Sequence, residues 1–242
     1  MRLIRPDAQR RIDLPGAPGP VPRPVDIGQA QTGFQVLRTL RIYRFEPGTR
    51  IEGHAEEDEV FIVALDGHVE LDVRAPESPE RHLVLAAADA AAPHAPCAVY
   101  LPAHGTYVLC APGAAEIAYA RATPRAARAP ASFAPPQVPQ RKADLPVVLD
   151  VGRHADRLRL QVLHGTPARG AARAELFGGG GSPGEALLHV RALGAAPQLA
   201  VRVGARCEAL ASGDTVVIGA GEPATLEVAA AEAVTALLVW GE

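Results

Sequence analysis

The sequence predicts an all-β protein made of two small antiparallel β-barrels in tandem. Short β-branched and apolar runs recur about every 8–12 residues, with Pro-Gly and Asp-Gly turns between them, a spacing typical of small barrels or sandwiches. This pattern occurs twice, on either side of a proline-rich stretch. Only residues 229–238 show an ambiguous helical period, so helices contribute little to the predicted fold.

The first half begins with residues 1–33, whose proline and glycine content predicts an extended N-terminal arm. A barrel is then predicted over residues 34–122 from alternating apolar and polar residues. Its expected strands are residues 35–37, 40–45, 59–65, 68–74, 83–85, 98–101, 107–110 and 116–120.

A Pro/Ala-rich linker is predicted over residues 123–145, where five prolines recur among alanine, arginine and glutamine. A second barrel is predicted over residues 146–242. Its expected strands are residues 158–163, 187–191, 199–203, 214–218, 225–228 and 235–240.

Composition narrows the possible functions. The 242 residues include 24 basic and 27 acidic side chains and are 48% apolar, which favours neither a disordered chain nor an electrostatic nucleic-acid binder. No uncharged stretch approaches the roughly 20 apolar residues of a membrane span, and the amino terminus lacks a signal-peptide pattern. We therefore expect a cytoplasmic protein with no nucleic-acid or membrane partner. The sequence leaves the formation of a homodimer undecided, although exposed barrel sheets commonly pair.

One segment of the first half resembles the first signature of the cupin barrels, G-x5-H-x-H-x3-4-E-x6-G. Gly48 is followed after five residues by His54, and a glutamate, Glu56, stands at the second histidine position. Glu59 follows after two further residues instead of three or four, and Gly67 closes the segment after seven. The second signature is looser: Pro102 and Gly105 are one residue further apart than usual. Cupin barrels are double-stranded β-helices, also called jelly rolls, so the resemblance implies two such barrels.

The resemblance also implies a metal centre. Three histidines and a glutamate hold a divalent metal in cupins, and such a ligand set suits Mn, Fe, Ni or Zn. The candidate ligands in the first barrel are His54, Glu56, Glu59 and the displaced His104. The alternative is that His54 and the acidic run after it form a solvated turn and that no metal binds.

The second half keeps the spacing of the second cupin signature without its chemistry. Gly213, Gly219 and Gly221 fit, but Ala224 stands where the metal-binding histidine is expected. An alanine methyl group has no lone pair to donate. We therefore expect a degenerate second barrel without a metal.

The two halves together resemble the 5-deoxy-glucuronate isomerase family of inositol catabolism. The resemblance rests on an E-x7-G spacing at Glu59 and Gly67, and on residues 59–69, 98–102, 107–109, 111 and 116–118. It implies a bicupin whose metal and catalysis lie in the carboxy-terminal barrel. This chain departs from the family there, since Ala224 replaces a ligand and only Glu185 could match the ligand glutamate.

Two functions follow. The first is a divergent bicupin that binds a small molecule of the sugar-acid class, which would be an anion, through Tyr100, Tyr107, Arg159 and Arg191. The other interpretation of these residues is that the tyrosines are core and the arginines solvated. The alternative function is an active metal-dependent aldose–ketose isomerase of a sugar acid, an intramolecular oxidoreductase using a first-barrel site. A cupin-type dioxygenase would need the same missing histidines.

Overall fold

The computed structural model describes residues 1–87, 95–136, 140–142, 145–152, 154–167, 171–177, 184–192, 198–229 and 233–242. The chain divides into two compact units. The first barrel comprises Asp7–Pro135 and Val151–Leu158, and the second barrel comprises Met1–Pro6, Pro136–Asp150 and Arg159–Glu242. Each is described separately below.

In these described residues the elements are strands apart from one short helix, α1 (Gln29–Thr32). The strands assigned to the first barrel are β2 (Arg11–Ile12), β3 (Val21–Pro22), β4 (Val25–Gly28), β5 (Leu37–Phe45), β6 (Thr49–His54), β7 (Glu59–Asp66), β8 (His68–Arg74), β9 (Arg81–Ala86), β10 (Ala98–Leu101), β11 (Thr106–Ala111), β12 (Ala115–Ala122) and β13 (Ala131–Phe133). Those of the second barrel are β1 (Arg2–Ile4), β14 (Gln140–Lys142), β15 (Leu145–Asp150), β16 (Leu158–Gly165), β17 (Ala171–Glu175), β18 (Glu185–Ala192), β19 (Gln198–Val203), β20 (Arg206–Leu210), β21 (Thr215–Gly219), β22 (Ala224–Ala229) and β23 (Val234–Gly241).

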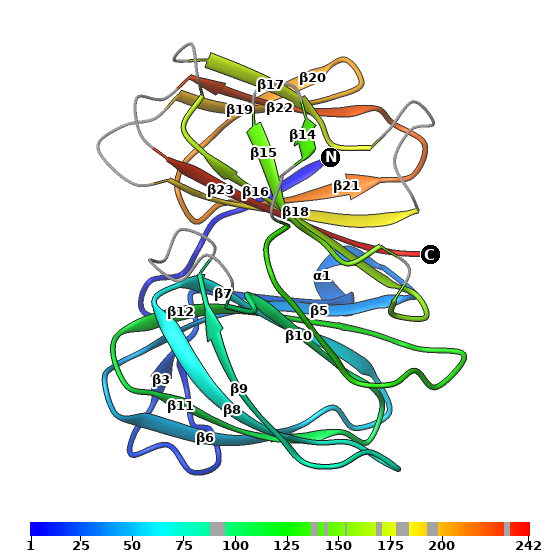
Figure 1. The fold of residues 1–242 in the computed structure, drawn as a ribbon. Coiled ribbons are helices and arrows are strands. Elements are labelled where there is room, and N and C mark those ends of the chain that lie inside the picture. Colours follow the sequence, from blue (N-terminus) through cyan, green and yellow to red (C-terminus); the bar gives the residue numbers. More distant parts are fainter. Residues whose placement is uncertain are drawn as a thin grey trace. The chain divides into compact units, whose positions relative to one another are not determined.

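The first barrel is built from a six-stranded and a four-stranded antiparallel sheet (Figure 1). The strand orders are β13-β10-β7-β12-β5-β4 and β6-β11-β8-β9. Alternate residues of these strands meet in one apolar core, which includes Val60, Ile62, Leu71 and Leu109. Burial by alternate residues is what the period-two pattern of the sequence predicts.

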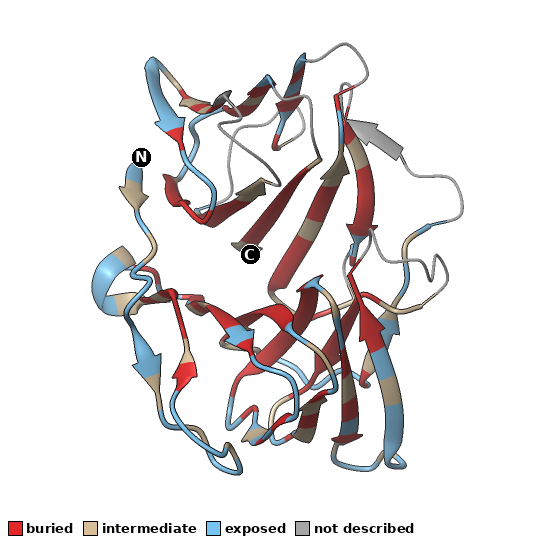
Figure 2. Cartoon of the chain, turned by 90° about the vertical axis from the view of Figure 1, so that its left-hand side faces the viewer, coloured by how far each residue is buried: buried red, intermediate tan, exposed pale blue. Residues whose placement is uncertain are grey.

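The second barrel repeats the same strand order. Its sheets run β1-β21-β18-β23-β16-β15-β14 and β17-β22-β19-β20. Each strand from β4 to β12 has a counterpart eleven labels later, from β15 to β23, in the same place of the corresponding sheet. The expected all-β fold of two tandem barrels is confirmed. In both barrels the buried residues lie mainly along the strands (Figure 2).

The segments predicted as arm and linker contain strands. In the first 33 residues, β1 pairs with β21 and β4 pairs with β5. Within residues 123–145, β13 pairs with β10 and β14 with β15. Residues 137–139 and 143–144 of the predicted linker lie outside the described residues. Among the described residues, no helix is long and apolar enough to cross a membrane.

The turn between β7 and β8 requires glycine at position 67. Gly67 has a φ of +65°, and a Cβ added there would lie 2.4 Å from the carbonyl oxygen of Ala114. A side chain would therefore meet both backbone strain and a clash with a main-chain atom.

We predict that Gly67→Ala lowers the free energy of unfolding by about 2–4 kcal/mol. The matched control is Gly113→Ala, because a Cβ at Gly113 meets nothing within 4 Å. Urea unfolding monitored by circular dichroism measures both. Equal stability of the two variants would contradict the assigned turn geometry.

Candidate functional site

The interior of the first barrel is defined by the alternation of side chains along its strands. On β7, Val60, Ile62 and Ala64 belong to the apolar core, so Glu59, which alternates with them, faces the opposite side. On β6 and the residue after it, Ile51 and Ala55 belong to the core. Their alternation places Arg50, Glu52 and His54 on the outer face.

Glu59 is fully buried but binds main-chain atoms of its own unit. Its carboxylate accepts hydrogen bonds from the backbone N–H groups of Asp156 at 2.8 Å, Arg157 at 2.8 Å and Leu158 at 2.6 Å. The Tyr100 hydroxyl donates a fourth bond at 3.1 Å. These bonds satisfy a buried charge that would otherwise be costly, and they tie residues 156–158 to the first barrel.

The other three predicted metal ligands lie near one another but apart from a shared interior site. His54 is exposed, with its Nδ1 3.9 Å from the Glu56 carboxylate. The His104 N–H donates to the Glu56 carbonyl at 2.6 Å. Among the described residues, no group of three or more histidine, cysteine or acidic side chains is arranged to hold a metal.

The residues next in sequence to the predicted ligands face inward, and they match the cupin spacing better than the predicted ligands do. Gly53, Ala55 and Val60 have the spacing of H-x-H-x4-E, and Val60-x6-Gly67 restores the usual distance to the closing glycine. Tyr107 faces inward on β11, directly opposite Gly53. A Cβ at Gly53 would lie 2.3 Å from the Tyr107 Cζ, so the phenol ring occupies the space of a side chain at that position.

The second barrel has aliphatic residues at the corresponding positions. Ala174 pairs with Leu226 as Gly53 pairs with Tyr107, and the Leu176 N–H bonds the Ala224 carbonyl. Ala174, Leu176, Ala186, Ala224 and Leu226 all belong to the apolar core of this barrel. Glu185, the residue considered as a ligand, begins β18 as Glu59 begins β7.

These residues do not fit the metal that the cupin resemblance implies. Of the described inward positions at the metal-ligand spacing of the two barrels, only Tyr107 carries a donor atom. Burial raises its pKa well above the usual value, which favours the neutral phenol. Divalent metals in proteins need several imidazole, carboxylate or thiolate donors. We therefore assign no metal-dependent step to either barrel.

Polar side chains gather instead at the end of the first barrel where β12 ends and β7 begins. Tyr43 and Tyr119 stack edge to face with centroids 6.5 Å apart, and the ring centroids of Tyr107 and Tyr119 lie 6.4 Å apart. Arg41 lies opposite Tyr119 in the pairing of β5 with β12. We call these side chains the Arg–Tyr cluster, which consists of Arg23, Arg41, Arg121, Tyr43, Tyr107 and Tyr119.

Basic groups outnumber acidic groups around this cluster. Asp26 is paired with Arg10, Arg23 and Arg41, the last two at 2.9 and 3.0 Å. Asp58 is paired with Arg38 and Arg121, and Arg121 also binds Glu56, whose pKa is lowered by this hydrogen bond. In the described part of this network, five guanidinium groups face three carboxylates.

Two of the arginines have nitrogen atoms without a protein partner. The Nε atoms of Arg23 and Arg121 are buried without a hydrogen bond, as is the Thr39 hydroxyl, which lies on β5 opposite Arg121. Buried polar atoms are normally satisfied, so such atoms indicate a place for a ligand or water. The Arg–Tyr cluster is the candidate binding site.

The predicted substrate-binding residues are not brought together by either unit. Tyr107 belongs to the cluster, whereas Tyr100 is buried against Glu59 on the other side of the sheet. In the second barrel, Arg159 is paired with Glu242 at 3.0 Å, and Arg191 lies opposite Thr235.

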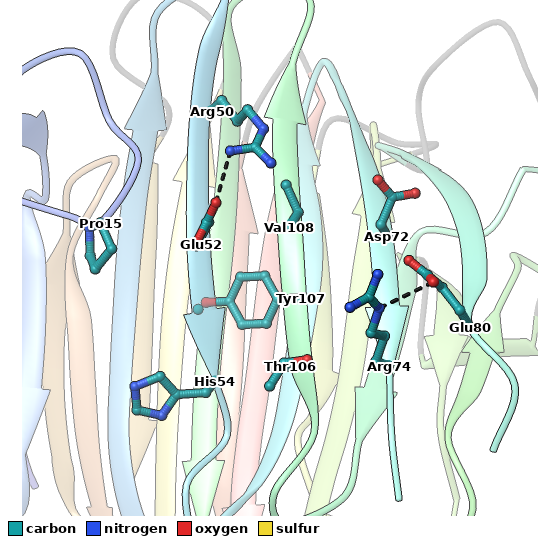
Figure 3. A pocket seen from close by; sticks show the side chains of 11 residues that line it. Pro15, Arg50, Glu52, His54, Asp72, Arg74, Glu80, Thr106, Tyr107 and Val108 are labelled. Carbon is teal, nitrogen blue, oxygen red and sulfur yellow. Dashed lines mark hydrogen bonds and ion pairs between the residues drawn. The ribbon is translucent and has the colours of Figure 1, made fainter. Parts of the chain in front are cut away.

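The outer face of the four-stranded sheet carries a hollow of about 580 Å³ (Figure 3). Arg50 and Glu52 pair at 2.9 Å and Arg74 and Glu80 at 3.1 Å, as the dashed lines show. These four side chains are half or more exposed, so their charges are screened by water. The hollow is therefore a weaker candidate for specific binding than the cluster.

The class of protein follows from the duplicated barrel and its structural relatives: the fold is that of a bicupin. A solved IolB-like protein from Salmonella typhimurium is similar with a TM-score of 0.67 at 14% identity, covering 96% of this chain and 93% of that one. The protein Ylba from E. coli gives 0.66 at 11%, covering 99% and 90%. A mutant of Bacillus subtilis oxalate decarboxylase gives 0.70 at 10%, covering 99% and 77%.

Residues 24–143 match the model of the KduI/IolB family. This match confirms the resemblance that the sequence predicted, and it spans most of the first barrel. A search of curated proteins finds no match. At these identities the solved structures establish the fold.

We predict that Glu59→Gln lowers the free energy of unfolding by about 2–4 kcal/mol. A glutamine amide has one oxygen acceptor instead of two. Its NH2 group would face backbone N–H groups, which are also donors and now bond to the carboxylate. Urea unfolding measures the loss, with Glu57→Gln, an exposed neighbour, as the matched control. A stability equal to that of the control would show that the four hydrogen bonds contribute little.

We also predict a delayed titration of tyrosine. Burial raises the pKa of Tyr119 to about 12 and also raises that of Tyr100 and Tyr107. Three of the four tyrosines should therefore remain largely neutral at pH 11 in the folded protein, whereas an unfolded chain ionises them near pH 10. Because the unfolded state then binds fewer protons, stability falls as the pH rises above about 10.

Absorbance at 295 nm counts the phenolates, and circular dichroism verifies that the chain is still folded. The same titration in urea supplies the reference. Four phenolates at pH 11 in a folded protein would contradict the burial of these hydroxyl groups.

Proposed function

We propose that this bicupin binds a small organic acid of the sugar-acid class at the Arg–Tyr cluster, without a metal. The observation that carries the proposal is the contrast inside the first barrel. Gly53, Ala55 and Val60 stand at the metal-ligand spacing of cupins, and the Tyr107 ring fills the space beside Gly53. Arginine and tyrosine side chains gather at the same end.

The chemistry of the cluster fits such a ligand. A guanidinium group binds a carboxylate through parallel N–H bonds, and the local excess of positive charge favours an anion. Neutral tyrosine hydroxyls can donate to and accept from the hydroxyl groups of a sugar. The similarity to the KduI/IolB family makes a sugar acid the first class to test.

The second barrel carries an aromatic residue at the place that corresponds to Arg121. Trp240 pairs with Ala186 as Arg121 pairs with Val60, so Trp240 takes the topological position of Arg121. Its ring contacts Phe177 edge to face, with centroids 6.0 Å apart. An aromatic pair in place of an ion pair favours the first barrel as the binding unit.

We predict that D-glucuronate or D-galacturonate raises the melting temperature of the purified protein and that D-glucose, which lacks the carboxylate, does not. Elemental mass spectrometry should find well under one transition metal per chain, and a chelator should leave uronate binding unchanged. About one metal per chain, with binding lost to the chelator, would support the metal-dependent isomerase instead. Failure of both uronates to bind would overturn the proposed function.

A further inference from the structure

Building on the proposed function, we propose that Arg121 binds the carboxylate of the ligand and that Glu56 occupies the carboxylate's place when the ligand is absent. Glu56 would then act as an internal competitor. The Arg–Tyr cluster would thus recognise an acid through Arg121, which lies outside both cupin signatures, and through Glu56, which stands at a histidine position of the first signature.

The contacts of Arg121 define its free side. Its Nη2 atom donates to the Ala55 carbonyl at 3.0 Å and binds Asp58 at 2.8 Å as well as Glu56. Its Nε atom is buried without a hydrogen-bond partner. One nitrogen thus serves three acceptors while another serves none, which leaves the guanidinium able to reorganise its bonds around a different carboxylate.

Exposure separates the two acidic partners. The side chain of Asp58 is 8% exposed, so Asp58 is a fixed part of the barrel. The side chain of Glu56 is 55% exposed, whereas that of Arg121 is 13% exposed. Glu56 therefore lies on the solvent side of Arg121, where an incoming carboxylate would bind. Because its side chain is already half exposed, little free energy is needed to move it into water.

The main chain at Glu56 is also in an unusual conformation. Its φ is +56°, in the left-handed region that non-glycine residues rarely adopt, and His104, which donates to the Glu56 carbonyl, has a φ of +64°. These two residues fix the loop in a conformation that directs the Glu56 side chain to Arg121. Strain of this kind persists where the surrounding structure maintains it.

The charge count supports a carboxylate as the displacing group. Five arginines surround Asp26, Glu56 and Asp58 in the described network. If Glu56 moves into solvent, two carboxylates remain beside five guanidinium groups. A ligand carboxylate restores the balance and gains a bond to a largely buried arginine, which is stronger than a bond in water.

The test is isothermal titration of D-glucuronate, with D-glucose as the uncharged probe, into the wild type and two variants. We expect Arg121→Gln to weaken glucuronate binding about tenfold or more, since it removes a charged hydrogen-bond donor. We expect Glu56→Gln to strengthen binding about threefold to tenfold, since the shape is kept and the competing charge is lost. Glucose should bind none of them.

Matched controls are Arg50→Gln and Glu57→Gln, which change the same charges at exposed positions outside the cluster. Arg121→Gln removes a partner of the buried Asp58, so circular dichroism must show that the variant is folded. The exposed Glu56 does not carry this risk, and a gain in affinity cannot come from misfolding.

The outcomes separate the two proposals. Glucuronate binding that is equal in wild type, Arg121→Gln and Glu56→Gln would overturn the roles of these two residues and leave the proposed function standing. No binding of D-glucuronate to the wild type or to Glu56→Gln would overturn this inference, and the proposed function falls as well when D-galacturonate also fails to bind the wild type. Binding that tightens in Glu56→Gln and is lost in Arg121→Gln supports the competition.

Discussion

The alternation of side chains along each strand decides which groups can act inside these barrels. On β7 this constraint directs Glu59 away from the core and Val60 into it. The Glu59 carboxylate then accepts hydrogen bonds from three backbone N–H groups of residues 156–158, while Val60, the next residue, packs in the core. A shift by one residue would exchange the two roles, because it exchanges the faces of the whole strand.

Alternation also explains how much of the molecule could be predicted. Apolar strands such as β7 and β12 were expected, since their burial is recorded in the residue pattern. The strands β6 and β17 were not expected, because exposed charges and small residues weaken their patterns. The regular recurrence of short apolar runs predicted the barrels. The spacing of the cupin motif could not by itself show which of Glu59 and Val60 faces inward.

The Arg–Tyr cluster left a signal of its own in the sequence. Arg41-x-Tyr43 and Tyr119-x-Arg121 place a charge and an aromatic ring on the same face of otherwise apolar strands. Their adjacency depends on the pairing of β5 with β12, which joins residues far apart in the chain. The ion pair of Arg121 with Glu56 depends on loop conformation and could not be deduced from spacing.

The pairing of β1 with β21 has a consequence for how the protein is made. Leu3 lies opposite Val216, so a strand from the start of the chain completes the sheet of the second barrel. During synthesis, β1 leaves the ribosome long before its partner exists. β1 can therefore pair with the edge strand β21 only after nearly all of this chain has been translated. A peptide fused ahead of Arg2 would disturb the folding of the second barrel, although that barrel is translated last.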